Sequence, residues 1–335
     1  MPRSRAIPRN GKTVVEQRRT TSCPRSVQVC SNRTTTIELT CVKSQRTSST
    51  GYFYAQNFRS TLAKACLPVG KAGVFCYINT MSKYLEVGIE AAKNAEKIIL
   101  EYLSPDIKIS LKSDNSPVTI ADQLAEKTIV ETIKKIFPDH SFLGEELGQQ
   151  NNNTEYTWII DPIDGTKDYS RGIPLFGTLI SLFHNNEVIL GVSNLPLMKE
   201  LMYAEKGKGA FVNRKPVSVS KVRNLEESYV TFGNFNYFVD KGYLDNLSNI
   251  TRKARGRRGS GDCWMYHLLA QGKLEVIMEA KTNIWDIAAP SLIVTEAGGK
   301  VTDFDGNPIK KNTTNILASN GFLHEEILAE LKRKR

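Results

Sequence analysis

Two aspartates separated by two residues follow an apolar segment near the middle of the chain. The apolar run 158–160 leads directly into Asp161, and a proline and an isoleucine separate it from Asp164. The proline fixes its own φ and restricts the residue before it, so the two carboxylates can converge at the end of one strand. Carboxylates held close together repel unless a cation lies between them, and oxygen-only ligands suit Mg²⁺ or Mn²⁺ rather than Zn²⁺. Gly165 and Thr166 come next, where backbone N–H groups could bind a phosphate.

Further acidic positions could supply more oxygen ligands. Glu145 and Glu146 follow a short apolar segment, Asp286 stands where an apolar helix begins, and Asp122 stands near the start of an earlier helix. Taken singly, each position also has an ordinary structural explanation. The glutamates could lie in a solvated loop, the aspartates could be helix N-caps, and Asp-Pro and Asp-Gly pairs are common in turns. Their joint occurrence in one chain favours a shared acidic site.

The elements that must position these residues follow from the spacing of apolar residues. Helices are predicted over 85–102, over 118–137, from about residue 262, and from Asp286 to about Ala297. Strands are predicted at 141–143, 158–160, 176–183, 188–192, 201–204 and 274–278. Because helices and strands mix without regular βαβ alternation, we predict a mixed α and β fold built of stacked layers rather than a doubly wound sheet.

Basic charge and cysteine are concentrated near the N-terminus. Residues 1–80 contain 13 Lys+Arg and 2 Asp+Glu, whereas residues 81–335 contain 32 and 33. Only Cys263 lies beyond residue 80, and a body with a single cysteine has no disulfide framework, which is typical of a reducing compartment. Residues 1–80 show no sustained helix or strand period. We therefore predict a folded domain over 81–335, preceded by a disordered or non-native extension.

Three origins of this extension are open. It could be upstream sequence joined to a start at Met81, which we favour, because a well-formed amphipathic helix follows Met81 at once. It could be an organelle transit peptide, which has a similar composition rich in Arg and Ser and poor in acids. It could also be a nucleic-acid-binding arm. We expect a cytoplasmic protein, or an organellar one if the extension is a transit peptide.

Two classes of partner are disfavoured by composition. The formal net charge of +10 would suggest nucleic acid, but residues 81–335 are nearly neutral and lack a basic stripe with interleaved aromatic residues. No apolar run approaches the ~20 residues that a membrane-spanning helix needs. We therefore predict neither a nucleic-acid nor a membrane partner, although a nucleic-acid-binding protein remains the alternative from another functional class.

The acidic motifs resemble those of a known family. Residues 161–169 and 285–299 resemble the two signature motifs of the inositol monophosphatase family of metal-dependent phosphatases. Gly144-Glu145-Glu146 matches its Gly-Glu-Glu motif, and residues 117–123 resemble its early helix. The four occur in the family's order and spacing, over essentially all of 81–335. The resemblance implies a layered αβαβα sandwich, a homodimer, and Mg²⁺-dependent hydrolysis of a small phosphorylated metabolite.

The resemblance also implies roles for single residues. Two or three Mg²⁺ ions, with Mn²⁺ as an alternative, would be bound by oxygens of five residues: Glu145, Asp161, the carbonyl of Ile163, Asp164 and Asp286. Gly165 and Thr166 would hold the phosphate, and Thr166 with Glu145 and Asp122 would activate the attacking water. The implied chemistry is a metal-assisted in-line displacement, which requires positioning and charge neutralisation but no covalent phosphoenzyme.

Finer motifs favour one branch of this family. Residues 172–180, 261–264 and 268–272 resemble the histidinol-phosphate phosphatases more than the inositol phosphatases. Where inositol phosphatases typically carry Gly-Thr-Ala, this chain has Gly-Asp262-Cys. Acids at Asp262 and Glu279 would attract the cationic histidinol phosphate. The alternatives are a helix N-cap for Asp262, a solvated strand end for Glu279, and an inositol 1-phosphate, sugar-phosphate or nucleotide-phosphate substrate.

One position departs from the histidinol-phosphate branch. Asp168 stands where a small residue is commoner, which leaves the chemistry of the entrance open. The four histidines, His140, His184, His267 and His324, show neither the spacing of metal ligands nor that of a catalytic triad. We therefore interpret them as structural.

Overall fold

The computed structural model describes residues 39–41, 53–55, 81–103, 110–111 and 117–333. The contacts within the chain divide it between Thr80 and Met81. In the first part, strands β1 (Leu39–Cys41) and β2 (Phe53–Ala55) pair in antiparallel fashion. The predicted disordered or non-native extension lies mostly outside the described residues and stays a prediction.

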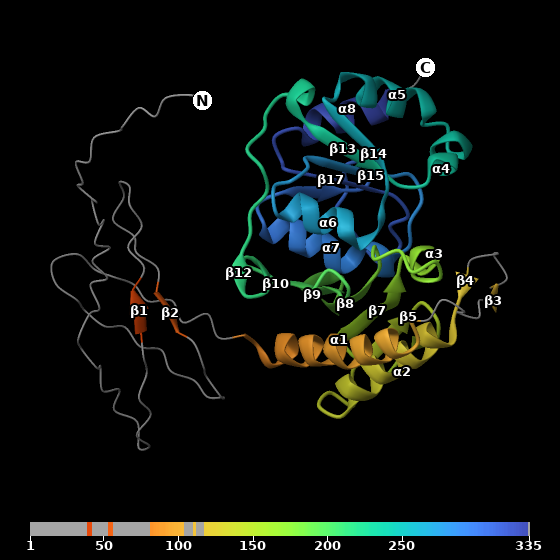
Figure 1. Ribbon diagram of the computed structural model, residues 1–335, viewed down its shortest axis with the longest axis vertical. Helices are drawn as coiled ribbons and strands as arrows, with labels where there is room; N and C mark the ends of the chain where they lie inside the picture. The colour runs from red at the N-terminus through yellow and green to blue at the C-terminus, as the bar shows by residue number, and fades with distance from the viewer. Residues whose placement is uncertain (1–38, 42–52, 56–80, 104–109, 112–116, 334–335) are drawn as a thin grey trace, which may run out of the picture. The chain divides into compact units, whose positions relative to one another are not determined.

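From Met81 onward, the elements alternate in space as helix, sheet, helix, sheet and helix (Figure 1). The mixed, layered αβαβα architecture predicted from the sequence is therefore confirmed. Four short elements lie outside the main layers, and they are β3 (Ser110–Leu111), β4 (Pro117–Val118), α3 (Thr166–Tyr169) and the 3₁₀ turn η1 (Leu225–Glu227).

The first layer consists of α1 (Lys83–Glu101) and α2 (Ile120–Lys134), which lie side by side. Ser82 caps α1, because its hydroxyl accepts a hydrogen bond from the N–H of Leu85 at 3.2 Å. Both helices bury their apolar faces against the first sheet. They confirm the two predicted helices, although α2 is shorter than the predicted range 118–137.

The first sheet has eight strands in the order β12-β11-β10-β9-β8-β7-β5-β6. Its strands are β5 (Ser141–Gly144), β6 (Gly148–Gln150), β7 (Tyr156–Asp164), β8 (Gly177–His184), β9 (Glu187–Leu195), β10 (Glu200–Glu205), β11 (Ala210–Val212) and β12 (Lys215–Pro216). Only β5 and β7 run parallel, and the other neighbours are antiparallel. β8 and β9, which cover the predicted strands 176–183 and 188–192, pair as a hairpin, and Asn185 at its turn has φ +56°.

The second helical layer lies between the two sheets and contains α6 (Asp262–Ala270) and α7 (Ile284–Glu296). The second sheet has five strands in the order β14-β13-β15-β17-β16. Its strands are β13 (Tyr229–Phe232), β14 (Gly256–Gly259), β15 (Val276–Glu279), β16 (Lys300–Thr302) and β17 (Ile316–Ser319). The outer helices are α4 (Phe235–Asp240), α5 (Leu244–Lys253) and α8 (His324–Lys332).

The parallel strands of both sheets matter for function. β5 and β7 are parallel in the first sheet, and β13, β14 and β15 are parallel in the second. Ligands of open α/β sheets commonly bind beyond the carboxyl ends of parallel strands. In the part of the chain that the structure describes, we find no helix with the length and apolarity needed to cross a membrane.

Candidate active site

A β-bulge brings together the two aspartates at the end of β7. Asp161 and Asp164 are three residues apart, a spacing that places side chains on opposite faces of a regular strand. In the pairing with β8, Asp161 lies opposite Leu179 and Asp164 lies opposite Gly177, so β7 contains one additional residue. The hydroxyl of Thr178 donates to a backbone carbonyl within this bulge at 2.9 Å. The bulge therefore allows both carboxylates to face one site.

The third carboxylate comes from the start of α7. Asp286 is the third residue of this helix and forms a capping box with Asn283, whose N–H donates to Asp286 Oδ2 at 2.8 Å. The alternative that Asp286 is itself the N-cap is wrong, because Asn283 holds that position. One carboxylate oxygen each from Asp161, Asp164 and Asp286 lie within 4.8 Å of one another.

The crowding of these acids is electrostatically unfavourable without a cation. Burial raises the pKa values of Asp161 and Asp164 well above the usual range, and neighbouring carboxylates raise them further. Burial also raises the pKa of Asp286 to about 7, against the lowering effect of the Asn283 N–H. Within the described residues, Asp161 Oδ1 is buried and has no hydrogen-bond partner. A divalent cation with oxygen ligands fits this arrangement.

Glu145 lies beside the aspartates because β5 and β7 are parallel neighbours. Gly144, the last residue of β5, is in register with Ile160, and the N–H of Glu145 donates to the Ile160 carbonyl at 3.2 Å. The half-buried Glu145 carboxylate contributes to the raised pKa values of Asp161, Asp122 and Asp286. Glu145 is therefore part of the same acidic site.

Asp122 and Thr166 meet at the same place. Asp122 is the third residue of α2 and forms a capping box with Thr119, so the alternative that Asp122 is the N-cap is also wrong. Asp122 Oδ1 lies 3.3 Å from the hydroxyl of Thr166, which also donates to the carbonyl of Ile163 at 2.9 Å. Burial raises the pKa of Asp122, although two hydrogen bonds from Thr119 lower it. The hydroxyl, the carboxylate and the carbonyl thus form one contiguous group.

Gly165 occupies a position that favours glycine. Its φ is +85°, and a Cβ at this residue would lie 2.8 Å from the carbonyl oxygen of Leu175. This left-handed residue turns the chain from β7 into the four-residue helix α3, which begins at Thr166. The tight turn keeps Thr166 next to the carboxylates of β7.

Two further acids lie at the ends of elements in the second half of the chain. Asp262 is the exposed first residue of α6, with φ +63°, and the N–H of Cys263 donates to Asp164 Oδ2. Gly261 is the N-cap of α6, so the N-cap alternative for Asp262 is wrong. Partial desolvation by the surrounding protein, and then repulsion from the Asp168 carboxylate, raise the pKa of Asp262 to about 6. Asp262 nevertheless remains exposed to solvent.

Glu279 is the last residue of β15 and is half-buried. Its Oε1 accepts a hydrogen bond from the hydroxyl of the buried Tyr266 at 2.6 Å. Burial raises the pKa of Glu279 to about 8, and the bond from Tyr266 lowers it. The Asp262 and Asp286 carboxylates also raise this pKa, so Glu279 faces the same acidic region. Glu279 does end a strand, but it is half-buried and faces other acids, so the alternative of a solvated strand end is wrong.

Comparison with known proteins places the chain and its fold in one family. The sequence profile described as "Inositol monophosphatase family" matches residues 80–335. The chain belongs to the inositol monophosphatase family. It is therefore a phosphoric monoester hydrolase, in a family that generally uses Mg²⁺.

The chain is similar both to proteins named as histidinol-phosphatases and to proteins named as inositol monophosphatases. A histidinol-phosphatase from Chlorobaculum parvum is 35% identical over 252 residues, which cover 75% of this chain and 97% of that protein. A fructose-1,6-bisphosphatase/inositol-1-monophosphatase from Thermotoga maritima is 36% identical over 211 residues, covering 63% of this chain and 80% of that protein. The solved structure of the extragenic suppressor protein suhB from Bartonella henselae has a TM-score of 0.71 and 32% identity, covering 76% of this chain and all of that one.

One buried acid of this phosphatase was missed by the sequence analysis. Glu126 lies one helical turn beyond Asp122 on α2 and is only 1% exposed. Its oxygens accept hydrogen bonds from the N–H groups of Glu146 at 2.8 Å and Leu147 at 3.1 Å. Burial raises the pKa of Glu126 to about 7, and these two N–H donors lower it. A glutamate among the apolar residues of a helical face is the signal that could have indicated it.

The histidines pair with groups outside the acidic cluster. His140 accepts a hydrogen bond from the indole N–H of Trp158, His184 pairs with the Glu155 carboxylate, and His324 lies between the hydroxyls of Thr302 and Ser319. His267 Nε2 lies 2.8 Å from the Ser193 hydroxyl, and His267 Nδ1 lies 3.2 Å from the Glu200 carboxylate. This Ser-His-Glu arrangement resembles a hydrolytic triad. Ser193 and His267 are each only 1% exposed, so a substrate cannot reach them. Neither this group nor the other three histidines provides a second hydrolase site.

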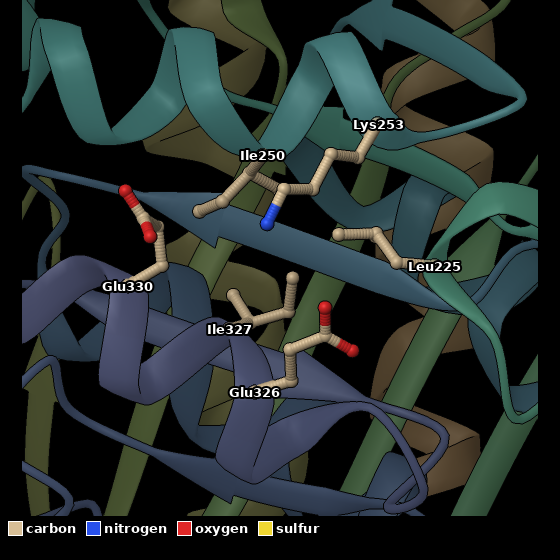
Figure 2. A pocket seen from close by; sticks show the side chains of 6 residues that line it. All are labelled: Leu225, Ile250, Lys253, Glu326, Ile327 and Glu330. Carbon is tan, nitrogen blue, oxygen red and sulfur yellow. The ribbon is translucent and has the colours of Figure 1, made fainter.

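A small cavity between α5 and α8 is separate from the acidic site. Its lining residues are Leu225, Ile250, Lys253, Glu326, Ile327 and Glu330 (Figure 2). Its volume of about 40 Å³ leaves room for little more than water. It shares no residue with the carboxylate cluster and is too small for a phosphorylated metabolite.

Proposed function

We propose that the chain is a Mg²⁺-dependent histidinol-phosphatase that converts L-histidinol phosphate to L-histidinol and phosphate in histidine biosynthesis. Family membership supplies the reaction class. The choice of substrate is supported by the similarity to histidinol-phosphatases from three bacteria, at 34–36% identity. It is supported independently by the acids Asp262 and Glu279, which lie near Asp164 and Asp286 of the proposed metal-binding cluster.

The proposed metal ligands are all oxygen atoms. Carboxylates of Glu145, Asp161, Asp164 and Asp286 and the carbonyl of Ile163 would hold two or three Mg²⁺ ions, with Mn²⁺ as a substitute. The close approach of three aspartate oxygens and the unpartnered Oδ1 of Asp161 support this assignment. When bound, the cations would neutralise negative charge and activate water for attack on phosphorus.

The residues around the cluster would orient the attacking water. The Thr166 hydroxyl is held between Asp122 Oδ1 and the Ile163 carbonyl, so its oxygen can accept a hydrogen bond from water. Asp122 and Glu145 would take the proton that the water loses. Positioning of this kind is the main protein contribution to phosphoryl transfer, because the transition state needs alignment and charge neutralisation.

The two ends of the substrate would meet different surroundings. Backbone N–H groups at Gly165 and Thr166 would bind the phosphate, beside the cations. The leaving group carries an ammonium and an imidazole, which Asp262 and Glu279 would attract in their ionised forms. A cationic group beside Glu279 would lower the raised pKa of that residue and favour its carboxylate form. The proximity of the acids Asp262 and Glu279 is the main observation that supports a cationic phosphate ester as the substrate. Inositol 1-phosphate, whose inositol group carries no positive charge, would gain less from either acid.

A second substrate class is supported by the relatives named as fructose-1,6-bisphosphatase/inositol-1-monophosphatase. The test is phosphate release by the purified chain with Mg²⁺, comparing histidinol phosphate and inositol 1-phosphate. A higher kcat/KM for histidinol phosphate is expected, and a clear preference for inositol 1-phosphate would overturn the proposal.

We further propose a cytoplasmic homodimer, with an organelle as the alternative location if residues 1–80 are a transit peptide. Light scattering of the purified chain tests the dimer.

A further inference from the structure

The turn that carries Glu145 rests on a buried carboxylate. Glu126 lies beneath residues 145–147, and its two oxygens accept hydrogen bonds from two successive backbone N–H groups, those of Glu146 and Leu147. A buried glutamate is costly unless it is hydrogen-bonded in this way. These bonds direct the carboxylate at the backbone of the turn rather than at the cluster of Asp161, Asp164 and Asp286.

Gly144 provides the space for this contact. A Cβ at Gly144 would lie 1.7 Å from Glu126 Oε1, 2.3 Å from its Cδ and 2.8 Å from its Oε2. The three nearest atoms all belong to Glu126, so no other group restricts the size of residue 144 as closely. Gly144 and Glu126 are therefore complementary, because the absence of a side chain at Gly144 on β5 leaves space for the Glu126 carboxylate from α2.

The backbone of Glu145 is consequently held from two sides. Its own N–H donates to Ile160 on β7 at 3.2 Å, and the next N–H donates to Glu126 on α2 at 2.8 Å. Asp122 is on the same helix, one turn before Glu126, and contacts Thr166. One rigid helix thus sets both the position of the Glu145 turn and the position of Asp122.

We infer that Glu126 is a positioning residue that fixes the Glu145 turn in the geometry that binds the divalent cation. This inference rests on the proposed metal site, in which Glu145 is a ligand. Glu126 would act through the backbone of the turn, because its two oxygens accept hydrogen bonds from the N–H groups of Glu146 and Leu147. Residues that orient metal ligands typically change metal affinity or activity by about 10–100-fold when they are replaced.

The test measures Mn²⁺ binding to the metal-free full-length protein by electron paramagnetic resonance, without substrate. Glu126→Gln keeps the size of the side chain but places an NH₂ group against one of the two N–H donors. We expect Mn²⁺ affinity to fall about 10-fold or more. The control is Glu131→Gln, the same change on the exposed face of the same helix, which should bind Mn²⁺ as the wild type does.

A double-mutant cycle separates positioning from general damage. Gly144→Ala should weaken Mn²⁺ binding by displacing Glu126, whereas Gly144→Ala combined with Glu126→Ala should be no worse than Glu126→Ala alone, because the obstructing atoms are gone. Melting curves of every variant show whether it folds. If Glu126→Ala does not fold, Glu126→Gln and Gly144→Ala still decide the question.

The possible outcomes are distinct. Weakened Mn²⁺ binding in folded Glu126→Gln, with wild-type binding in Glu131→Gln, supports the inference. Unchanged Mn²⁺ affinity in Glu126→Gln, with or without a lower melting temperature, overturns it and leaves Glu126 with a merely structural role. Absence of Mn²⁺ binding to the wild type would overturn the proposed metal site together with this inference.

Discussion

Replacing Asp262 by asparagine should selectively impair a cationic substrate. Asp262 has φ +63°, a left-handed conformation that asparagine tolerates better than most residues, so Asp262→Asn preserves backbone and shape while it removes the charge. Gly261, not Asp262, is the N-cap of α6, so no helix cap is lost. The variant should therefore fold with a melting temperature close to that of the wild type.

The size of the effect follows from exposure. Exposed ion pairs contribute about 0.2–1 kcal/mol, and Asp262 is open to solvent, so we expect KM for histidinol phosphate to rise up to about fivefold. Glu279 is half-buried and held by Tyr266 at 2.6 Å. Charge-assisted hydrogen bonds in such surroundings contribute about 1.5–3 kcal/mol, so Glu279→Gln should raise the same KM about tenfold or more.

The assay is steady-state phosphate release with saturating Mg²⁺, using histidinol phosphate and inositol 1-phosphate for each variant. Turnover of inositol 1-phosphate should change little, because this ester has no cationic group. Glu131→Gln, which removes a distant exposed charge, is the control for net charge. The reasoning is refuted if Asp262→Asn and Glu279→Gln affect both substrates equally, or if histidinol phosphate is unaffected by either change.

Three further predictions concern the metals, pH and the N-terminal region. Asp161→Asn or Asp164→Asn should fold but lose at least ~10²-fold in kcat, and EDTA should abolish activity until Mg²⁺ is restored; near-normal activity of either variant would contradict the ligand assignment. Carboxyl groups with a raised pKa stabilise the fold when protonated, and this stability is lost as pH rises from the unfolded pKa of ~4 through the folded pKa. With pKa values near 7 for Glu126 and Asp286 and near 8 for Glu279, the melting temperature in EDTA should fall as pH rises from about 4 to about 8, by about 2–4 °C per kcal/mol, and Mg²⁺ should reduce this fall. A flat profile in EDTA would contradict these pKa shifts. Deletion of residues 1–80 should leave kcat and the melting temperature of the remaining chain unchanged, and a large loss of either would show that these residues serve the domain.

The members of the acidic cluster could be predicted from the sequence where acids follow clear local elements. Asp161 and Asp164 end an apolar strand, and Asp286 stands in the first turn of an apolar helix, so their types and positions were visible in the chain itself. The bulge that aligns the first two was not visible, because it depends on the register with β8. The alternative that Asp122, Asp262 and Asp286 are N-caps was wrong by one to three positions, since cap geometry is set by backbone dihedrals rather than by residue type alone.

The second sheet was harder to predict. Of its strands, only β15 was foreseen, and β13, β14, β16 and β17 were not assigned. β14 consists of glycines and arginines, Gly256–Gly259, and reads as a loop, but it pairs as an edge strand with β13. The roles of Glu126 and Tyr266 likewise depend on contacts made only in the folded chain, with Glu146 and Glu279 respectively. Such contacts depend on tertiary packing, which local periodicity does not encode.

The most direct test of the central proposal is phosphate release by the purified full-length chain, with and without Mg²⁺. Histidinol phosphate, inositol 1-phosphate and adenosine 3′,5′-bisphosphate should be compared at equal concentrations. The account predicts Mg²⁺-dependent release, with the highest kcat/KM for histidinol phosphate. Release that is independent of a divalent cation would contradict the proposed metal site, and a higher kcat/KM for either of the other two substrates would contradict the proposed specificity.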